Sequence, residues 1–136
     1  MIDTCQLVQE VGMKMNIKKI VGIVAVMAIL AAPVLAGEYQ LLRPAELKNM
    51  LKNKDFFLLD VHVPEQTHLP GTDAFIDYRK IRQNSRQLPS EKGTRIVVYC
   101  QGGGMSLTAA RELLEMGYTH VYDLAGGTLA YNRLPD

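Results

Sequence analysis

The chain has 136 residues, of which 48% are hydrophobic and 21% are charged, and its formal net charge is +1. Residues 37–136 carry 12 basic and 12 acidic side chains, so this part lacks the positive excess that nucleic-acid-binding domains usually show. One hundred residues are enough for one modest hydrophobic core. The composition therefore predicts a single domain that does not bind nucleic acid.

The N-terminal segment has the order of parts that is typical of a secretory signal peptide. Lys18 and Lys19 precede an uncharged apolar run at 20–30, and small residues follow it up to Ala36. We expect residues 1–36 to be a signal peptide that is cleaved before Gly37, with residues 1–14 a mis-called start. The alternative is an uncleaved membrane anchor, but the run is shorter than the ~20 residues of a spanning helix. The domain at 37–136 is thus predicted to be exported, in the periplasm, with no membrane contact once the signal is removed.

Loss of the signal segment also removes Cys5 and leaves Cys100 without a partner in the chain. Exported proteins usually pair their cysteines in disulfides. A leftover cysteine indicates either a reactive thiol or a bridge to another molecule.

Helical patterns alternate with short apolar runs along the rest of the chain. A helix is expected at 44–51, where Pro44 suits the first turn and leucine and methionine recur on one face. An apolar run at 56–61 and a polar loop at 62–72 follow, and then a weaker helical segment at 78–87. A second apolar run lies at 96–99. The clearest helix, at 107–117, ends at a glycine, and a third apolar run lies at 120–124. None of the three runs alternates cleanly, which is typical of parallel strands covered on both faces. The pattern predicts an α/β fold with a small open parallel sheet flanked by helices on both faces.

Ligands of open α/β sheets bind beyond the carboxyl ends of the strands. One such end carries Cys100, followed by glycines at 102–104 and then by the clearest helix. Glycines let several N–H groups point to one centre, and a helix start adds unpaired N–H groups and partial positive charge. This setting favours the thiolate of Cys100, its nucleophilic form. The alternative is a glycine-rich turn in which Cys100 is a small buried hydrophobe. No lysine precedes the hydroxyl residues, which excludes a Walker A loop, and no spacing of ligand residues indicates a metal site.

Four segments together resemble a rhodanese-type sulfurtransferase domain. They are LLDVHVPE at 58–65, LPGTDAFI at 69–76, IVVYC at 96–100 and SLTAARELLEMGYTHVYDLAGG at 106–127. The resemblance covers nearly all of residues 44–131. It is strongest to small exported single-domain members that have Asp-Val-His where most have Asp-Val-Arg.

The resemblance implies a two-step transfer of sulfur without a cofactor. Cys100, at the head of a loop at 100–105, would attack the outer sulfur of an anionic donor such as thiosulfate and become a persulfide. Cyanide or another thiol would then accept that sulfur. The backbone amides of the next five residues would bind the negative charge: Gln101, Gly102, Gly103, Gly104 and Met105. Asp60 and His62 are candidate supporting residues, with a loop-capping carboxylate and a solvated loop histidine as the respective alternatives.

The loop departs from the family pattern because it has no arginine: Gln101, Gly104 and Met105 stand at the matching places. Loss of a guanidinium removes about 1.5–3 kcal/mol of charge-assisted hydrogen bonding. This departure keeps a second hypothesis open, a non-catalytic rhodanese-like binding module, and the lone thiol prompts a third, a mixed disulfide with another exported protein. A related phosphatase is disfavoured because position 106 is serine instead of arginine.

Overall fold

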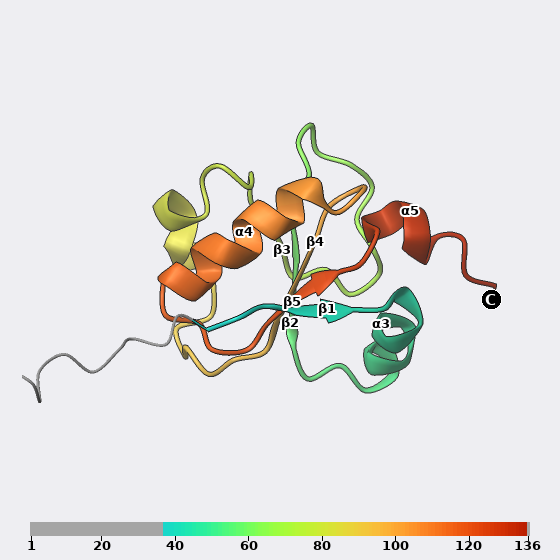
Figure 1. The fold of residues 1–136 in the computed structure, drawn as a ribbon, viewed down its shortest axis with the longest axis horizontal. Helices are drawn as coiled ribbons and strands as arrows, with labels where there is room; N and C mark the ends of the chain where they lie inside the picture. The colour runs from blue at the N-terminus through green and yellow to red at the C-terminus, as the bar shows by residue number, and fades with distance from the viewer. Residues whose placement is uncertain (1–36, 136) are drawn as a thin grey trace, which may run out of the picture. The chain divides into compact units, whose positions relative to one another are not determined.

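The computed structural model describes residues 37–135, so the predicted signal peptide, the predicted mis-called start and Cys5 lie outside the described residues. Figure 1 shows the arrangement of its helices and strands. The strands are β1 (Gln40–Leu42), β2 (Phe57–Asp60), β3 (Ala74–Phe75), β4 (Ile96–Tyr99) and β5 (Val121–Leu124). The helices are α3 (Pro44–Met50), α4 (Gly104–Glu115) and α5 (Gly127–Tyr131), with 3-10 turns η1 (Leu51–Asn53) and η2 (Arg82–Gln87).

The five strands form one parallel sheet in the order β1-β5-β4-β2-β3. All four residues of the central strand β4 are buried, as a strand covered on both faces requires. The predicted α/β fold with an open parallel sheet is therefore confirmed.

Side chains of β4 alternate between two hydrophobic clusters, one on each face of the sheet. Ile96, Val98 and Cys100 pack with Ala110 and Leu113 of α4, and we call this side the α4 face. On the opposite side, the α3–α5 face, the side chains come from β4 and from the helices α3 and α5: Val97, Tyr99, Leu47 and Tyr131. Figure 1 shows α4 on one side of the strands and α3 with α5 on the other. Cys100 therefore belongs to the α4 face.

The structure differs from the sequence-based prediction at three segments. The short edge strands β1 and β3 were not predicted, because three- and two-residue strands give no periodic signal. The segment predicted as a helix at 78–87 contains the 3-10 turn η2, none of whose residues is buried, so no apolar face holds an α-helix there. The residues Gly127–Tyr131, for which no helix was predicted, form α5. Among residues 37–135, no helix is long and apolar enough to cross a membrane.

Candidate active site

Cys100 follows the last residue of β4 and opens the loop that leads into α4. Its side chain is buried, with 1% of the residue exposed. The Gly103 amide donates a hydrogen bond of 3.0 Å to Sγ, and the thiol lies 3.5 Å from Oγ of Ser106, to which it donates. Gly103 has a φ of 107°, a left-handed conformation that glycine adopts without strain and that turns its N–H toward the sulfur. The sulfur is thus enclosed by the loop, in contact with one of the amides predicted to hold it.

The remaining loop amides are uncommitted. Within the described part of the chain, the N–H groups of Gln101, Gly102, Gly104 and Met105 donate to no protein acceptor. Gln101, Gly102 and Gly104 are exposed. Because α4 has 12 residues and begins at Gly104, its first turn adds the positive end of a helix dipole. These four amides, which we call the amide cradle, are therefore available to bind an anion beside Cys100.

Backbone amides at the start of α5 bind carbonyl groups at the beginning of the loop. Thr128 N–H donates to the Cys100 carbonyl at 2.9 Å, and Leu129 N–H donates to the Gln101 carbonyl at 3.1 Å. Gly127 has a φ of 57°, and a Cβ at this position would overlap the Cys100 carbonyl oxygen. The close approach therefore requires glycine at 127, and Gly126 and Gly127 lie at the N-terminus of a short helix.

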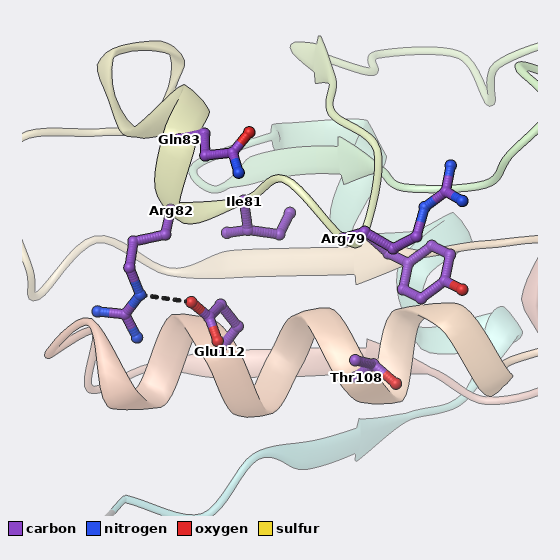
Figure 2. Close-up of a pocket in the computed structure, with 7 residues that line it drawn as sticks. Arg79, Ile81, Arg82, Gln83, Thr108 and Glu112 are labelled. Atoms are coloured by element: carbon purple, nitrogen blue, oxygen red, sulfur yellow. Dashed lines mark hydrogen bonds and ion pairs between the residues drawn. The ribbon is translucent and has the colours of Figure 1, made fainter.

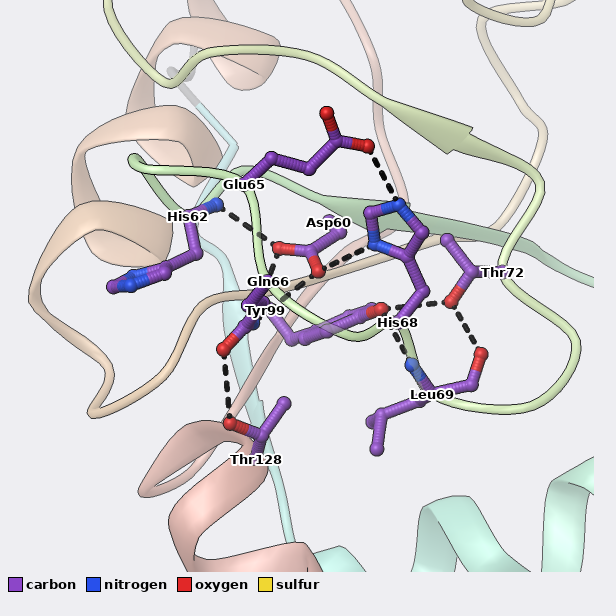
Figure 3. A network of polar contacts seen from close by, with 9 residues as sticks. All are labelled: Asp60, His62, Glu65, Gln66, His68, Leu69, Thr72, Tyr99 and Thr128. Carbon is purple, nitrogen blue, oxygen red and sulfur yellow. Dashed lines mark hydrogen bonds and ion pairs between the residues drawn. The ribbon is translucent and has the colours of Figure 1, made fainter.

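Met105 and His62 meet the site in different ways. Met105 is partly buried against the cluster of the α4 face, and its Sδ accepts a hydrogen bond of 3.5 Å from Val63 N–H. His62 donates its backbone N–H to Oδ1 of Asp60 at 2.9 Å, while its imidazole points away from that carboxylate (Figure 3). The segment after β2 therefore reaches the loop through the Val63 backbone.

Asp60 lies on the α3–α5 face, at the end of β2 beside Tyr99. The carboxylate is fully buried and accepts from Gln66 Nε2 at 3.2 Å, while His68 Nδ1 lies 2.9 Å away. Figure 3 shows these groups converging on Asp60. The hydrogen bond to Asp60 raises the pKa of His68 above its ordinary value. Asp60 thus contacts three residues of the loop after β2, and the sheet separates it from the side chain of Cys100. Its role as a supporting or a capping residue stays a prediction.

Other partners in this network had no clear sequence signal. Glu65 lies 3.0 Å from Nε2 of His68, and Thr128 Oγ1 donates to Oε1 of Gln66 at 3.3 Å. Burial raises the pKa of Tyr99 to about 12, and its hydroxyl accepts from the Leu69 amide at 2.9 Å. Thr128 therefore links the Asp60 network to the carbonyl of Cys100 through two hydrogen bonds.

Two polar residues under the loop were not predicted either. Ser106 is fully buried, and Asp123 of β5 is 4% exposed. Burial raises the pKa of the Asp123 carboxyl, and the Ser106 hydroxyl opposes this effect. The signal for Asp123 was present in the sequence, since it is the one charged side chain within the apolar run at 120–124.

A surface groove lies away from the cysteine, between η2 and α4. It encloses about 540 Å³. Arg82 Nε donates to Glu112 Oε1 at 2.6 Å across it, and Arg79 is paired with Asp77, also at 2.6 Å. Figure 2 shows the Arg82–Glu112 pair. Because both arginines are paired with carboxylates, neither supplies the guanidinium that the loop lacks.

Residues 37–135 contain no group of three or more His, Cys, Asp or Glu side chains arranged for a metal ion. This finding does not test whether the protein uses a metal or a cofactor, so the expectation that it uses neither stays a prediction.

Comparison with known proteins places this geometry in a family. The model of the rhodanese-like domain matches residues 43–134. The thiosulfate sulfurtransferase PspE of Escherichia coli (strain K12) is 29% identical over 108 residues, which cover 77% of this chain and 86% of PspE. The tRNA uridine(34) hydroxylase of Cytophaga hutchinsonii is 33% identical over 96 residues, and the match spans 66% of this chain and 30% of that protein. The chain therefore spans about a third of the hydroxylases it matches.

Solved structures agree with the family match. A rhodanese-like domain protein from Staphylococcus aureus has a TM-score of 0.57 at 26% identity, covering 68% of this chain and 90% of that chain. The rhodanese-related protein of Thermoplasma volcanium has a TM-score of 0.59 at 22% identity, covering 71% and 96%. Fold, loop and family model agree, and the chain belongs to the rhodanese-like domain family.

Proposed function

We propose that this protein is a sulfurtransferase or persulfide carrier that takes a sulfane sulfur onto Cys100 and passes it to a thiophilic acceptor. The observation that carries the proposal is the position of Cys100 at the head of a loop with four uncommitted amides that leads into α4. PspE is a thiosulfate sulfurtransferase, and this chain is similar to it over most of its length. The similarity supports a donor of the thiosulfate class.

The chemistry divides into two displacements. Sγ of Cys100, as thiolate, attacks the sulfane sulfur of the donor, and the bond from that sulfur to the rest of the donor breaks. The leaving group, sulfite in the case of thiosulfate, keeps the electron pair. A thiol or cyanide then attacks the outer sulfur of the persulfide, and the cysteine thiolate leaves. Each step has a stabilised anion as leaving group, as covalent catalysis requires.

The cradle suits the charge that this reaction carries. The outer sulfur of a persulfide bears negative charge, and the amides of Gln101, Gly102, Gly104 and Met105 are the donors that stabilise it. The same amides bind the anionic part of the donor before attack. Because the loop has no cationic side chain, we expect thiosulfate to bind weakly, and a neutral or singly charged sulfane donor to react better.

We also propose that the domain works outside the cytoplasm, in the periplasm. The support is the order of lysines, apolar run and small residues before Gly37. Fractionation of cells that express the full chain, with N-terminal sequencing of the product, tests this proposal. A product that begins at Gly37 in the periplasmic fraction is the expected result, and full-length chain retained in the membrane fraction would favour the anchor instead.

The alternative function is a non-catalytic binding module that holds a small anion or a partner. Two observations favour it: Cys100 is 1% exposed, and the loop is neutral.

Mass spectrometry separates the two functions. The purified protein is incubated with thiosulfate, with a polysulfide and with glutathione persulfide, and the intact mass is measured before and after treatment with a thiol. We expect a gain of one sulfur atom that the thiol removes and that the Cys100→Ser variant does not show. If no donor adds sulfur to the folded protein, the binding module is the correct function.

A further inference from the structure

Two amides of the amide cradle belong to peptide units that the start of α5 holds. The carbonyl of Cys100 shares a peptide unit with the Gln101 amide, and the carbonyl of Gln101 shares one with the Gly102 amide. Thr128 N–H donates to the first carbonyl at 2.9 Å, and Leu129 N–H donates to the second at 3.1 Å. A trans peptide unit is planar, and its C=O and N–H bonds point in opposite directions. The start of α5 therefore fixes the direction in which the amides of Gln101 and Gly102 point.

The side chain of Thr128 ties this turn to the loop after β2. Thr128 is 6% exposed, and its hydroxyl donates to Oε1 of Gln66 at 3.3 Å. Nε2 of Gln66 in turn donates to the two carboxylate oxygens of Asp60, at 3.3 and 3.2 Å. Figure 3 shows the Gln66 amide between the hydroxyl and the carboxylate. Thr128 therefore has its N–H on the cysteine loop and its hydroxyl on a buried polar network.

Asp60 is the fixed end of this chain of hydrogen bonds. Its carboxylate is fully buried at the end of β2, accepts from the His62 amide at 2.9 Å and lies 2.9 Å from Nδ1 of His68. In the sheet, β2 lies between β4 and β3, so its end is held by a strand on either side. The hydrogen bonds from Asp60 through Gln66 to Thr128 therefore connect the sheet to the turn that holds the loop.

The alternative is a purely structural role, in which the Thr128 hydroxyl has a partner only because a buried polar group needs one. Such a role predicts that loss of the hydroxyl lowers stability and leaves the direction of the loop amides unchanged. The two roles therefore differ in what they predict for the binding of an anion beside Cys100.

We propose that Thr128 is a positioning residue, whose hydrogen bond to Gln66 holds the start of α5 so that the amides of Gln101 and Gly102 point at the anionic part of a substrate. This inference rests on the proposed function, because these are the amides that bind the donor in that reaction. Thr128 acts through the backbone of the loop and takes no part in the making or breaking of bonds.

Alkylation of Cys100 by two reagents tests the inference without any sulfur donor. The thiolate forms a bond to carbon and displaces iodide from both iodoacetate and iodoacetamide, but only iodoacetate carries a carboxylate. The ratio of the two rate constants therefore measures anion binding beside the sulfur. A change in the pKa or the exposure of the thiol alters both rates together and leaves this ratio unchanged. Peptide mass spectrometry of the full chain measures alkylation at Cys100 separately from Cys5.

The wild type is compared with variants on both sides of the hydrogen bond. Thr128→Val keeps the shape and the N–H but removes the hydroxyl, whereas Thr128→Ser retains the hydroxyl. Gln66→Met removes the acceptor, and the double variant removes both groups. Thr119→Val is the matched control, because this exposed threonine has a hydroxyl 2.9 Å from Nδ1 of His120. Circular dichroism verifies that each variant is folded.

Thr128→Val should lower the ratio of iodoacetate to iodoacetamide rate constants roughly 2- to 10-fold, the range that one neutral hydrogen bond supplies. Gln66→Met should also lower it. The double variant should fall no further than Gln66→Met alone, since both changes act through the same hydrogen bond. Thr128→Ser and Thr119→Val should keep the wild-type ratio.

An unchanged ratio in Thr128→Val would overturn the inference and leave Thr128 with a structural role. Losses that multiply in the double variant would overturn it as well, because the two side chains would then act independently. Failure of the proposed function gives a different result: the ratio depends on Thr128 and Gln66 as described, but no donor places sulfur on Cys100.

Discussion

Asp60 and Asp123 are both buried acidic residues at the sheet, yet their surroundings are opposite. Asp60, on the α3–α5 face, receives hydrogen bonds from the His62 amide and from Gln66 and lies against His68. Asp123, on the α4 face, has an oxygen without a hydrogen-bond partner among residues 37–135. A buried carboxylate with several partners holds a loop in place, whereas one with an unpaired oxygen lowers the stability of the folded state. The contrast predicts opposite changes in folding stability when each of the two carboxyl groups is replaced.

Removal of the satisfied carboxylate should have the largest effect. Asp60→Ala leaves the His62 amide and the side chains of Gln66 and His68 without their acceptor, and loss of one member of a buried charged network costs about 3–5 kcal/mol. Urea unfolding measures this change. Asp55→Ala removes an exposed partner of Arg95 and serves as the matched control, with an expected cost of about 0.5 kcal/mol. Equal costs for the two variants would contradict the structural role of Asp60.

A cationic side chain placed in the loop after Cys100 should increase the rate of the proposed sulfur transfer. A Cβ at Gly104 meets no atom within 4 Å, and the residue has no positive φ, so the structure accommodates Gly104→Arg. The new guanidinium should gain about 1.5–3 kcal/mol toward an anionic donor, or roughly 10- to 150-fold in kcat/KM for thiosulfate.

Steady-state assays with thiosulfate and cyanide measure the Gly104→Arg effect, and Gly104→Gln controls for side-chain bulk. An equal gain in the glutamine variant, or none in the arginine variant, would show that missing charge does not limit the loop.

Replacement of the unsatisfied carboxyl should stabilise the fold. Burial raises the pKa of Asp123, so the folded state holds its proton more tightly than the unfolded state. The wild type therefore loses stability as pH rises from about 3.9, the unfolded value, through the raised folded value. Asp123→Asn escapes this loss and should be about 1 kcal/mol more stable at pH 7. Thermal unfolding from pH 4 to pH 8 measures the difference, and a wild type that stays the more stable at every pH would contradict it.

The smallest effect should come from His68. The Asp60 carboxylate raises its pKa above the ordinary 6.5, so the stabilisation is fully present below about pH 6.5 and is lost as pH rises through the folded value. About a third of this side chain is exposed, which limits the gain to about 1 kcal/mol.

The stability difference between wild type and His68→Gln should therefore be largest near pH 5.5 and shrink as pH rises. Denaturant unfolding at several pH values measures it. A difference that grows with pH would mean that neutral histidine is the form bound to Asp60.

The sequence predicted the features that depend on local pattern and left out those that depend on register. The buried strands, the helix after Cys100 and the glycine loop follow from periodicity and residue type over short stretches. The placement of Asp123 beneath the cysteine depends instead on the pairing of Val98 with that residue, which no local pattern specifies. The link from Thr128 to Gln66 joins residues far apart in the chain and likewise requires the folded structure.

The contact of α5 with the loop has a consequence for protein engineering. The carbonyl groups of Cys100 and Gln101 are bound by amides of Thr128 and Leu129, so a distant segment fixes the direction in which the sulfur presents itself. A graft of residues 100–105 alone into another scaffold would transfer the amides and the thiol but not the contacts that fix their orientation. Transplantation of this chemistry therefore requires the loop and the Gly126–Leu129 turn as a single unit.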